Sequence, residues 1–201
     1  IAVCFNSSLL KYGDDLAVGT MTILTSLMQF ALMPLQGLTQ GAQPIVSYNY
    51  GARNAERVRT AFKTLLTSCL VYSMTMWTLV QLFPQVFIRL FNNDAALVDY
   101  AVRAVRIYMA ATGIFGIQIA CQQTFIALGN AKASLFLALL RKIILLVPLI
   151  YILPNFFADK VFAVFLAEPV ADTLAVCTTA TMFAVQFRRS MRELEQPGGA
   201  A

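Results

Sequence analysis

Long stretches without a charged side chain limit this chain more than any other feature of its sequence. Asp, Glu, Lys and Arg are absent from residues 16–52, 64–88 and 107–131. Two further apolar stretches, 133–153 and 161–187, contain only two charged residues each. A helix needs about 20 mostly apolar residues to cross the hydrocarbon core of a bilayer. The pattern therefore predicts an integral membrane protein.

The composition and the length of the apolar runs indicate helices rather than a barrel. Hydrophobic residues make up 59% of the chain and charged residues 12%, whereas about a quarter of the residues of a soluble domain are charged. Strands of a membrane barrel have about 9–11 residues and alternate polar with apolar side chains, which these runs do not do. Since the backbone in lipid must satisfy its own hydrogen bonds, we expect an all-α, polytopic membrane helix bundle.

We expect one transmembrane unit over residues 1–192 and a disordered cytoplasmic tail over 193–201. The polar segment 48–57 is predicted to be a loop. Because the sequence begins with Ile1 inside an apolar helix, we also expect a fragment of a longer chain. The expected spans, of which the first is only the end of a helix, are about 1–12, 15–47, 56–90, 95–128, 131–153 and 160–188.

The orientation in the membrane follows from the Lys and Arg residues of the short connections, which are richer on the cytoplasmic side. One set of alternate connections holds Arg53, Arg57, Arg59, Lys63, Lys132, Arg188, Arg189 and Arg192; the other holds Lys11, Arg89, Arg103, Arg106 and Lys160. The first set is larger, which predicts a cytoplasmic C-terminus. The net charge of +5 then faces anionic membrane lipids, so it does not call for a nucleic-acid partner.

Four segments of the sequence occur in an order typical of one transporter family. These segments are GLTQGAQPIVSYNYGAR at 37–53, FNND at 91–94, ALGNAKAS at 127–134 and LAEPVAD at 166–172. They resemble the multidrug and toxic compound extrusion (MATE) family, in particular its bacterial branch of MepA-type exporters. The resemblance implies twelve helices in two lobes of six. This chain would be the C-terminal lobe, with a partial first helix, and its partner would be the missing N-terminal lobe.

The same resemblance implies a function. Such a protein is a secondary antiporter in the cytoplasmic (inner) membrane of a bacterium. It exports drugs or other small, cationic organic molecules in exchange for H⁺ or Na⁺, through alternating access of its two lobes. Some relatives carry acidic ion sites on the seventh and tenth helices, where this chain has Asn6 and Gln118 instead. An alternative within the same superfamily is a flippase for lipid-linked oligosaccharides.

The residue types of the chain do not predict an enzyme. The sequence has no histidine, its four cysteines are scattered singly, and it has no glycine-rich phosphate loop. We therefore expect neither a catalytic residue, nor a metal site, nor a cofactor other than the coupling ion.

Uncharged polar side chains within the apolar runs are candidates for a substrate cavity. Gln29, Gln36, Gln40 and Gln43 fall on one face of a helix, which predicts either a neutral cavity wall or hydrogen bonds between packed helices. The same two interpretations apply to Gln118 and Gln122, which lie four residues apart. The predicted cavity-lining residues are Asn6, Gln36, Gln40, Gln43, Gln118 and Gln122.

Three charged residues are expected to lie at similar depth near the middle of the membrane. Arg141 falls about ten residues into one expected helix, and Glu168 and Asp172 lie about nine and thirteen residues into the next. An unpaired charge at this depth is costly, so we expect them to pair. The pairing is either a static link within the lobe or a functional site, in which one carboxylate, preferably Glu168, carries a proton or contacts a cationic drug. Lys142 is expected to face elsewhere.

Overall fold

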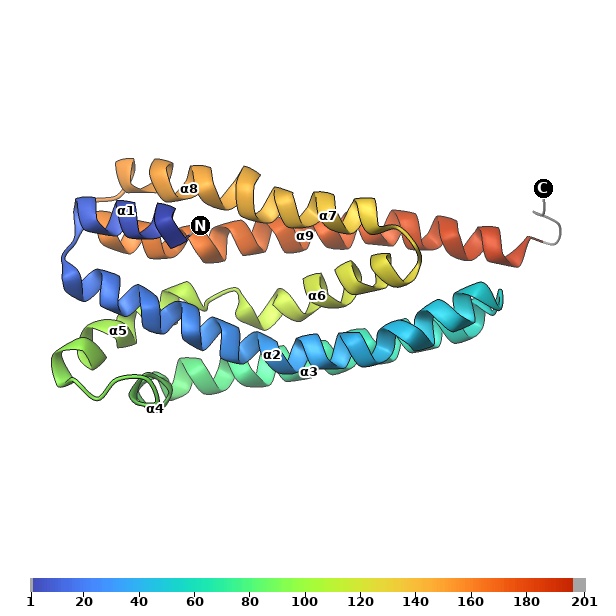
Figure 1. Cartoon of the computed structure of the whole chain (residues 1–201), viewed down its shortest axis with the longest axis horizontal. Helices are drawn as coiled ribbons and strands as arrows, with labels where there is room; N and C mark the ends of the chain where they lie inside the picture. The colour runs from blue at the N-terminus through green and yellow to red at the C-terminus, as the bar shows by residue number, and fades with distance from the viewer. Residues whose placement is uncertain (1, 197–201) are drawn as a thin grey trace.

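The computed structural model describes residues 2–196, and this part of the chain folds almost entirely into helices (Figure 1). Short turns connect them. The α-helices are α1 (Ala2–Tyr12), α2 (Asp15–Gly51), α3 (Ala55–Leu82), α4 (Pro84–Arg89), α5 (Ala95–Tyr108), α6 (Thr112–Ala127), α7 (Ala131–Leu139), α8 (Val147–Ile152) and α9 (Lys160–Glu195). A π-helix, Leu140–Leu146, joins α7 to α8, and a 3₁₀ turn, Leu153–Asn155, follows α8.

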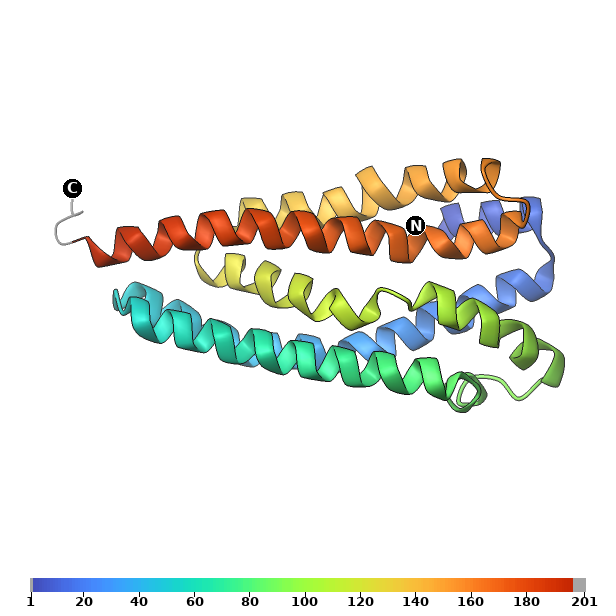
Figure 2. The same cartoon turned by 180° about the vertical axis from the view of Figure 1, so that it is seen from behind.

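The helices form an elongated bundle whose long elements run roughly parallel to its long axis. In Figures 1 and 2, α7, α8 and α9 lie along one side, α2 and α3 lie along the other, and α6 runs between them. The turns before α2, α5 and α9 lie at one end of the bundle. The turns before α3 and α7 lie toward the other end, beyond which the last part of α9 projects.

Helices long and apolar enough to cross a membrane are present, as the sequence predicts. Within residues 2–196, four continuous helical segments pass this test: Asp15–Gly51, Ala55–Leu82, Ala131–Asn155 and Lys160–Glu195. The pair α5 and α6 passes together, although its two halves are bent by 50°. The predicted class, an all-α bundle with several membrane spans, is therefore confirmed.

Two helices extend further than the sequence pattern indicates. The sequence predicts a loop over 48–57, but α2 continues to Gly51 and α3 begins at Ala55. Polar residues there support helix: Asn49 donates a side-chain hydrogen bond to the carbonyl of Ile45, one turn back. The predicted tail 193–201 is wrong at its start, because α9 continues to Glu195; residues 197–201 lie outside the described residues.

Two expected spans are interrupted. The span expected over 56–90 breaks at Phe83, because Pro84 has no amide hydrogen and restricts the residue before it. The span expected over 95–128 breaks between Tyr108 and Thr112, where backbone amides bond to carbonyls three residues back, such as Thr112 to Met109. No proline marks this second break, so no local sequence signal predicts it.

Close packing of α3 against α6 holds the centre of the bundle together. The Ser73 hydroxyl on α3 donates a buried hydrogen bond of 2.7 Å to the carbonyl of Gly113 on α6. A Cβ atom added to Gly116 would lie 2.6 Å from the carbonyl oxygen of Cys69. Small residues at such a contact allow two membrane helices to approach closely.

We predict that Gly116→Ala destabilises the intact protein by about 1–3 kcal/mol, since the added methyl group must displace the α3 backbone. Thermal unfolding in detergent would measure this loss. Gly19→Ala in α2 is the matched control, because its new Cβ would meet only Leu97 at an ordinary 3.6 Å. Equal midpoints for the two variants would contradict the packing described here.

Candidate functional site

The expected charged residues meet inside the bundle, between the α7–α8 segment and α9. Arg141 donates from Nη2 to Glu168 Oε1 at 3.0 Å and from Nε to Asp172 Oδ1. Lys142 Nζ lies 3.4 Å from the same Glu168 oxygen. We call Arg141, Lys142, Glu168 and Asp172 the charge cluster. The pairing expected from depth alone is present, whereas its role stays a prediction.

The two carboxylates come from consecutive turns of α9. Glu168 and Asp172 are four residues apart, so they share one face, and both are almost completely buried. Pro169 lies between them inside the helix and cannot donate a backbone hydrogen bond. The Thr173 hydroxyl donates to the Pro169 carbonyl at 2.7 Å. Between the two carboxylates, α9 therefore lacks one backbone donor, although it stays α-helical from Lys160 to Glu195.

The prediction for Lys142 is wrong, and the π-helix explains why. In an α-helix with about 3.6 residues per turn, neighbours such as Arg141 and Lys142 point in clearly different directions. Residues 140–146 are wound as a π-helix, whose wider turn brings consecutive side chains closer in direction. This winding and the length of the Lys142 side chain together let both cations reach Glu168. Such π-helical segments are frequent at functional sites and have no simple sequence signature.

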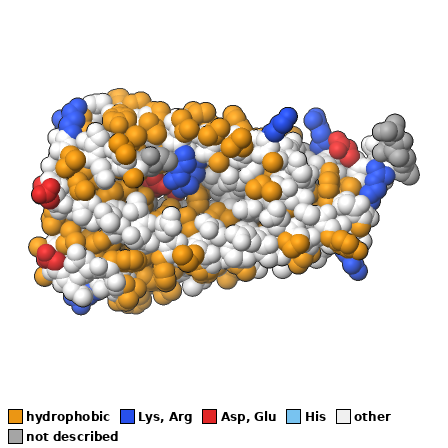
Figure 3. Space-filling model, viewed as in Figure 1, with side chains coloured by type: hydrophobic (Ala, Val, Ile, Leu, Met, Phe, Trp, Pro, Cys, Tyr) orange, Lys and Arg blue, Asp and Glu red, His pale blue; other side chains and the backbone are white. Residues whose placement is uncertain are grey.

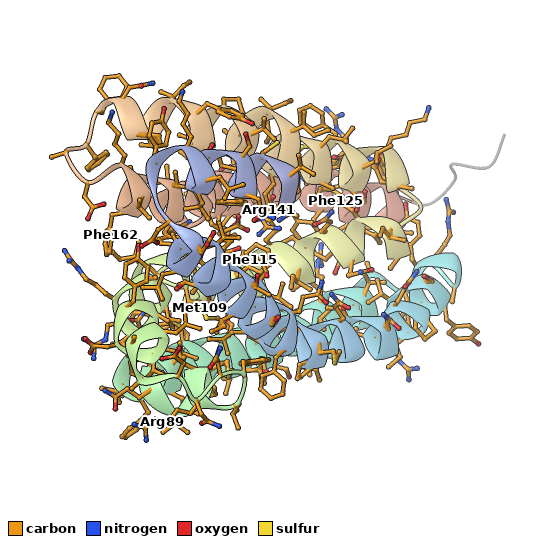
Figure 4. The ribbon with its side chains drawn as sticks, turned by 60° about the vertical axis from the view of Figure 1, so that its left-hand side comes forward. Arg89, Met109, Phe115, Phe125, Arg141 and Phe162 are labelled. Atoms are coloured by element: carbon orange, nitrogen blue, oxygen red, sulfur yellow. The ribbon has the colours of Figure 1, made fainter. Side chains whose placement is uncertain are left out.

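Aromatic side chains from the bent α5–α6 pair close the cluster on another side. The guanidinium carbon of Arg141 lies 4.4 Å from the ring centre of Phe115, a cation–π contact. Figure 4 shows these two side chains close together in the middle of the bundle. Tyr108, also buried, is close enough to interact electrostatically with Arg141 and both carboxylates. The sequence did not single out either aromatic residue.

The cluster is balanced in charge but leaves one oxygen atom without a partner. Two cations face two carboxylates, so the four ionised groups sum to zero. Both contacts to Glu168 use Oε1, and within residues 2–196 its buried Oε2 has no hydrogen-bond partner. A buried acceptor in this state costs free energy unless a proton, a water molecule or a ligand reaches it.

One edge of the cluster is open to the surface. The side chain of Lys142 is 38% exposed, against 2% for Glu168 and 11% for Arg141. On the face drawn in Figure 3, most charged side chains lie toward the two ends, but one basic side chain lies beside an acidic one away from both ends. The cluster therefore reaches the surface through Lys142, while both carboxylates stay buried.

The predicted cavity glutamines do not gather at one place. Gln36 and Gln40 are exposed on α2 and Gln43 is partly exposed, so these side chains point away from this bundle. Asn6 is exposed on α1. They therefore do not form hydrogen bonds that pack the described helices together, and the hypothesis of a cavity wall remains for them.

The glutamines of α6 are placed differently. Gln122 donates from Nε2 to the carbonyl of Ser134 on α7 at 3.1 Å, which is a bond between helices. Gln118 is buried, and in the described part of the chain its Oε1 has no partner. In that same part, no three His, Cys, Asp or Glu side chains lie close enough to hold a metal ion.

Comparison with known proteins gives consistent results. The MatE family model matches residues 2–152. The multidrug export protein MepA of Staphylococcus saprophyticus is 24% identical over 186 residues, which is 92% of this chain and 39% of that protein. An FAD transporter of Shewanella oneidensis is 25% identical over 167 residues, 83% of this chain and 36% of that protein. The chain thus spans about two fifths of the length of these curated relatives.

A solved structure supports the same assignment. The structure of the MATE multidrug transporter DinF-BH superposes with a TM-score of 0.77 at 34% sequence identity. The match covers 92% of this chain and 41% of that one. The described helices therefore have the arrangement of one lobe of such a transporter.

We predict that Arg141→Met destabilises the intact protein by about 3–5 kcal/mol, because it leaves carboxylates buried without their main partner. Lys142→Met, a change of the same chemistry one residue away, should cost about 1 kcal/mol or less, because its side chain is partly exposed. Thermal unfolding in detergent compares the two. A loss for Lys142→Met as large as that for Arg141→Met would contradict the geometry.

Proposed function

The chain belongs to the MatE family, and on that premise we propose that it is the second lobe of a bacterial secondary exporter. The exporter would carry drugs or other organic cations out of the cytoplasm in exchange for H⁺ or Na⁺. The observation that carries this proposal is the match of the family model to residues 2–152. The chain covers about two fifths of the length of its transporter relatives, which is why we propose one lobe rather than a whole transporter.

The exposed glutamines suit a cleft between two lobes. Hydrocarbon does not hydrogen-bond side-chain amides, so a helix face that carries exposed Gln36 and Gln40 is costly in lipid. The cost disappears if this face of α2 borders a water-filled cavity opposite a first lobe. Uncharged amides there would hydrogen-bond many different substrates, and rocking of the lobes would expose the cavity to each side in turn.

Glu168 is the residue we propose as the site where an ion or a cationic substrate binds. Its Oε2 atom is buried and free of partners within the described residues, while Oε1 is held by Arg141 and Lys142. A proton or a cation arriving at Oε2 would weaken the hold of the carboxylate on these two cations. Because they lie on the π-helix, binding would be coupled to the contact between the α7–α8 segment and α9.

A second cargo class is an anionic aromatic molecule, suggested by the similarity to an FAD transporter. The feature that would meet such a molecule here is the partly exposed Lys142, which lies beside the contact of Arg141 with Phe115. The lipid-linked oligosaccharide of the alternative function is also an anion. The efflux experiment therefore includes cationic and anionic cargo.

The central prediction concerns efflux from bacterial cells that lack their own drug pumps and express the full-length transporter. We expect ethidium efflux that stops when the proton gradient or the sodium gradient is collapsed, and the gradient that matters identifies the coupling ion. Failure of ethidium and other cationic dyes to leave the cells, together with export of FAD or a lipid-linked oligosaccharide, would contradict the drug assignment.

The role of Glu168 is tested in the same assay. Glu168→Gln should reduce gradient-driven efflux at least about tenfold, since the amide cannot take up a proton or neutralise a cation. Asp172→Asn removes the same charge one turn away and should retain more activity, because Glu168 Oε2 remains. Glu193→Gln, at the exposed end of α9, is the control. Equal losses for Glu168→Gln and Asp172→Asn would indicate a purely structural ion pair.

We also propose that the C-terminus and the connections before α3 and α7 face the cytoplasm, because the richer set of Lys and Arg lies there. In a variant whose native cysteines are replaced, Asn54→Cys should react with a membrane-impermeant maleimide only after permeabilisation. Asn93→Cys, at the other end, should react in intact cells. The reverse pattern would overturn the orientation.

A further inference from the structure

We infer that a groove between α3 and α9 binds an anionic phospholipid. The groove has a volume of about 530 Å³ and lies where the first turns of α3 run beside the last turns of α9. Its lining residues are Arg59, Phe62, Lys63, Phe187, Arg188, Met191, Arg192 and Glu195. This proposal does not depend on what the protein exports.

The floor of the groove is apolar and consists of packed aromatic rings. The ring centres of Phe62 and Phe187 are 5.0 Å apart, and each lies within 5.0 Å of Phe183, whose side chain is buried. Met191 beside them is also buried. The floor offers an apolar surface to the first carbons of an acyl chain.

The rim of the groove is strongly basic. Arg59 and Lys63 are four residues apart on α3, and Arg188 and Arg192 are four residues apart on α9, so each pair lies on one helix face. The only acidic lining residue, Glu195, pairs with Arg59 at 2.7 Å. Within residues 2–196, none of the other three basic side chains contacts a carboxylate.

The position along the helices matches the level of lipid headgroups. The uncharged run of α3 begins at Thr64, directly after Lys63, and that of α9 ends at Phe187, directly before Arg188. The basic rim therefore lies where two membrane spans leave the hydrocarbon. The aromatic floor lies at the same level: Phe62 falls between Arg59 and Lys63, and Phe187 directly precedes Arg188.

These features together fit one chemical class of ligand. Arginine forms paired hydrogen bonds with phosphate oxygens, and basic pockets between membrane helices bind acidic headgroups. A zwitterionic lipid carries a cation that this rim would repel. A free phosphate ion would use the rim but gain nothing from the aromatic floor. The occupant proposed is therefore a phospholipid with net negative charge, such as phosphatidylglycerol.

The test measures lipid binding to the full-length protein in detergent by native mass spectrometry, with dioleoyl-phosphatidylglycerol as the probe. Arg188→Gln/Arg192→Gln should weaken binding at least about tenfold. Each Arg near the surface adds to the attraction for an anionic headgroup, and the double variant removes two of these contributions. The matched control is Arg57→Gln/Lys132→Gln, which removes the same charge at the same end of the bundle but outside the groove. It should change binding by less than about twofold.

Three results would overturn the proposal. Equal losses for the two double variants would mean that general attraction to the positive end of the bundle, rather than this groove, holds the lipid. Equally strong retention of dioleoyl-phosphatidylcholine would exclude selection for negative charge. Displacement of the lipid by millimolar inorganic phosphate would identify a phosphate site that does not use the aromatic floor. Because none of these measurements involves transport, their outcome is separable from that of the efflux assay.

Discussion

The pairing of Arg141 with Glu168 and Asp172 is the interaction on which the rest of this bundle depends. It lies far from either end, where water is scarce and each ion would be costly alone. The two carboxylates fix the rotation of α9, and the guanidinium fixes the π-helix against it. Phe115 under the guanidinium extends this link to α6, so three segments distant in the sequence are positioned by one cation.

Much of this arrangement could be predicted from sequence, because hydrocarbon permits few solutions. Uncharged runs of sufficient length must be helices, and charges at equal depth must pair, which is how Arg141, Glu168 and Asp172 were placed together. The π-helix could not be predicted, because the number of residues per turn depends on what the segment packs against. The contact that Lys142, on this segment, makes with Glu168 was therefore not predicted either. The bend after Tyr108 was missed for the same reason, since it has no proline.

Polar side chains divide between the inside of the lobe and its outer face. Gln122 bonds to the α7 backbone and Gln118 is buried, so both belong to the lobe itself. Gln36 and Gln40 face outward from α2, where nothing in the described bundle covers them. Sequence periodicity placed these residues on helix faces, but only the arrangement of neighbouring helices decides whether a face is inside or outside. The outward face is the surface that we propose for a cavity between two lobes.

The most direct test of this account is a double-mutant cycle on the charge cluster of the full-length protein. The midpoint of thermal unfolding would be compared for Arg141→Met, for Glu168→Gln/Asp172→Asn, and for all three substitutions together. The account predicts that the triple variant recovers most of the stability lost in Arg141→Met, with a coupling of at least about 2 kcal/mol, because no buried charge is then left without its partner. Losses that simply add would show that these residues do not stabilise one another, and would contradict the central role of the cluster.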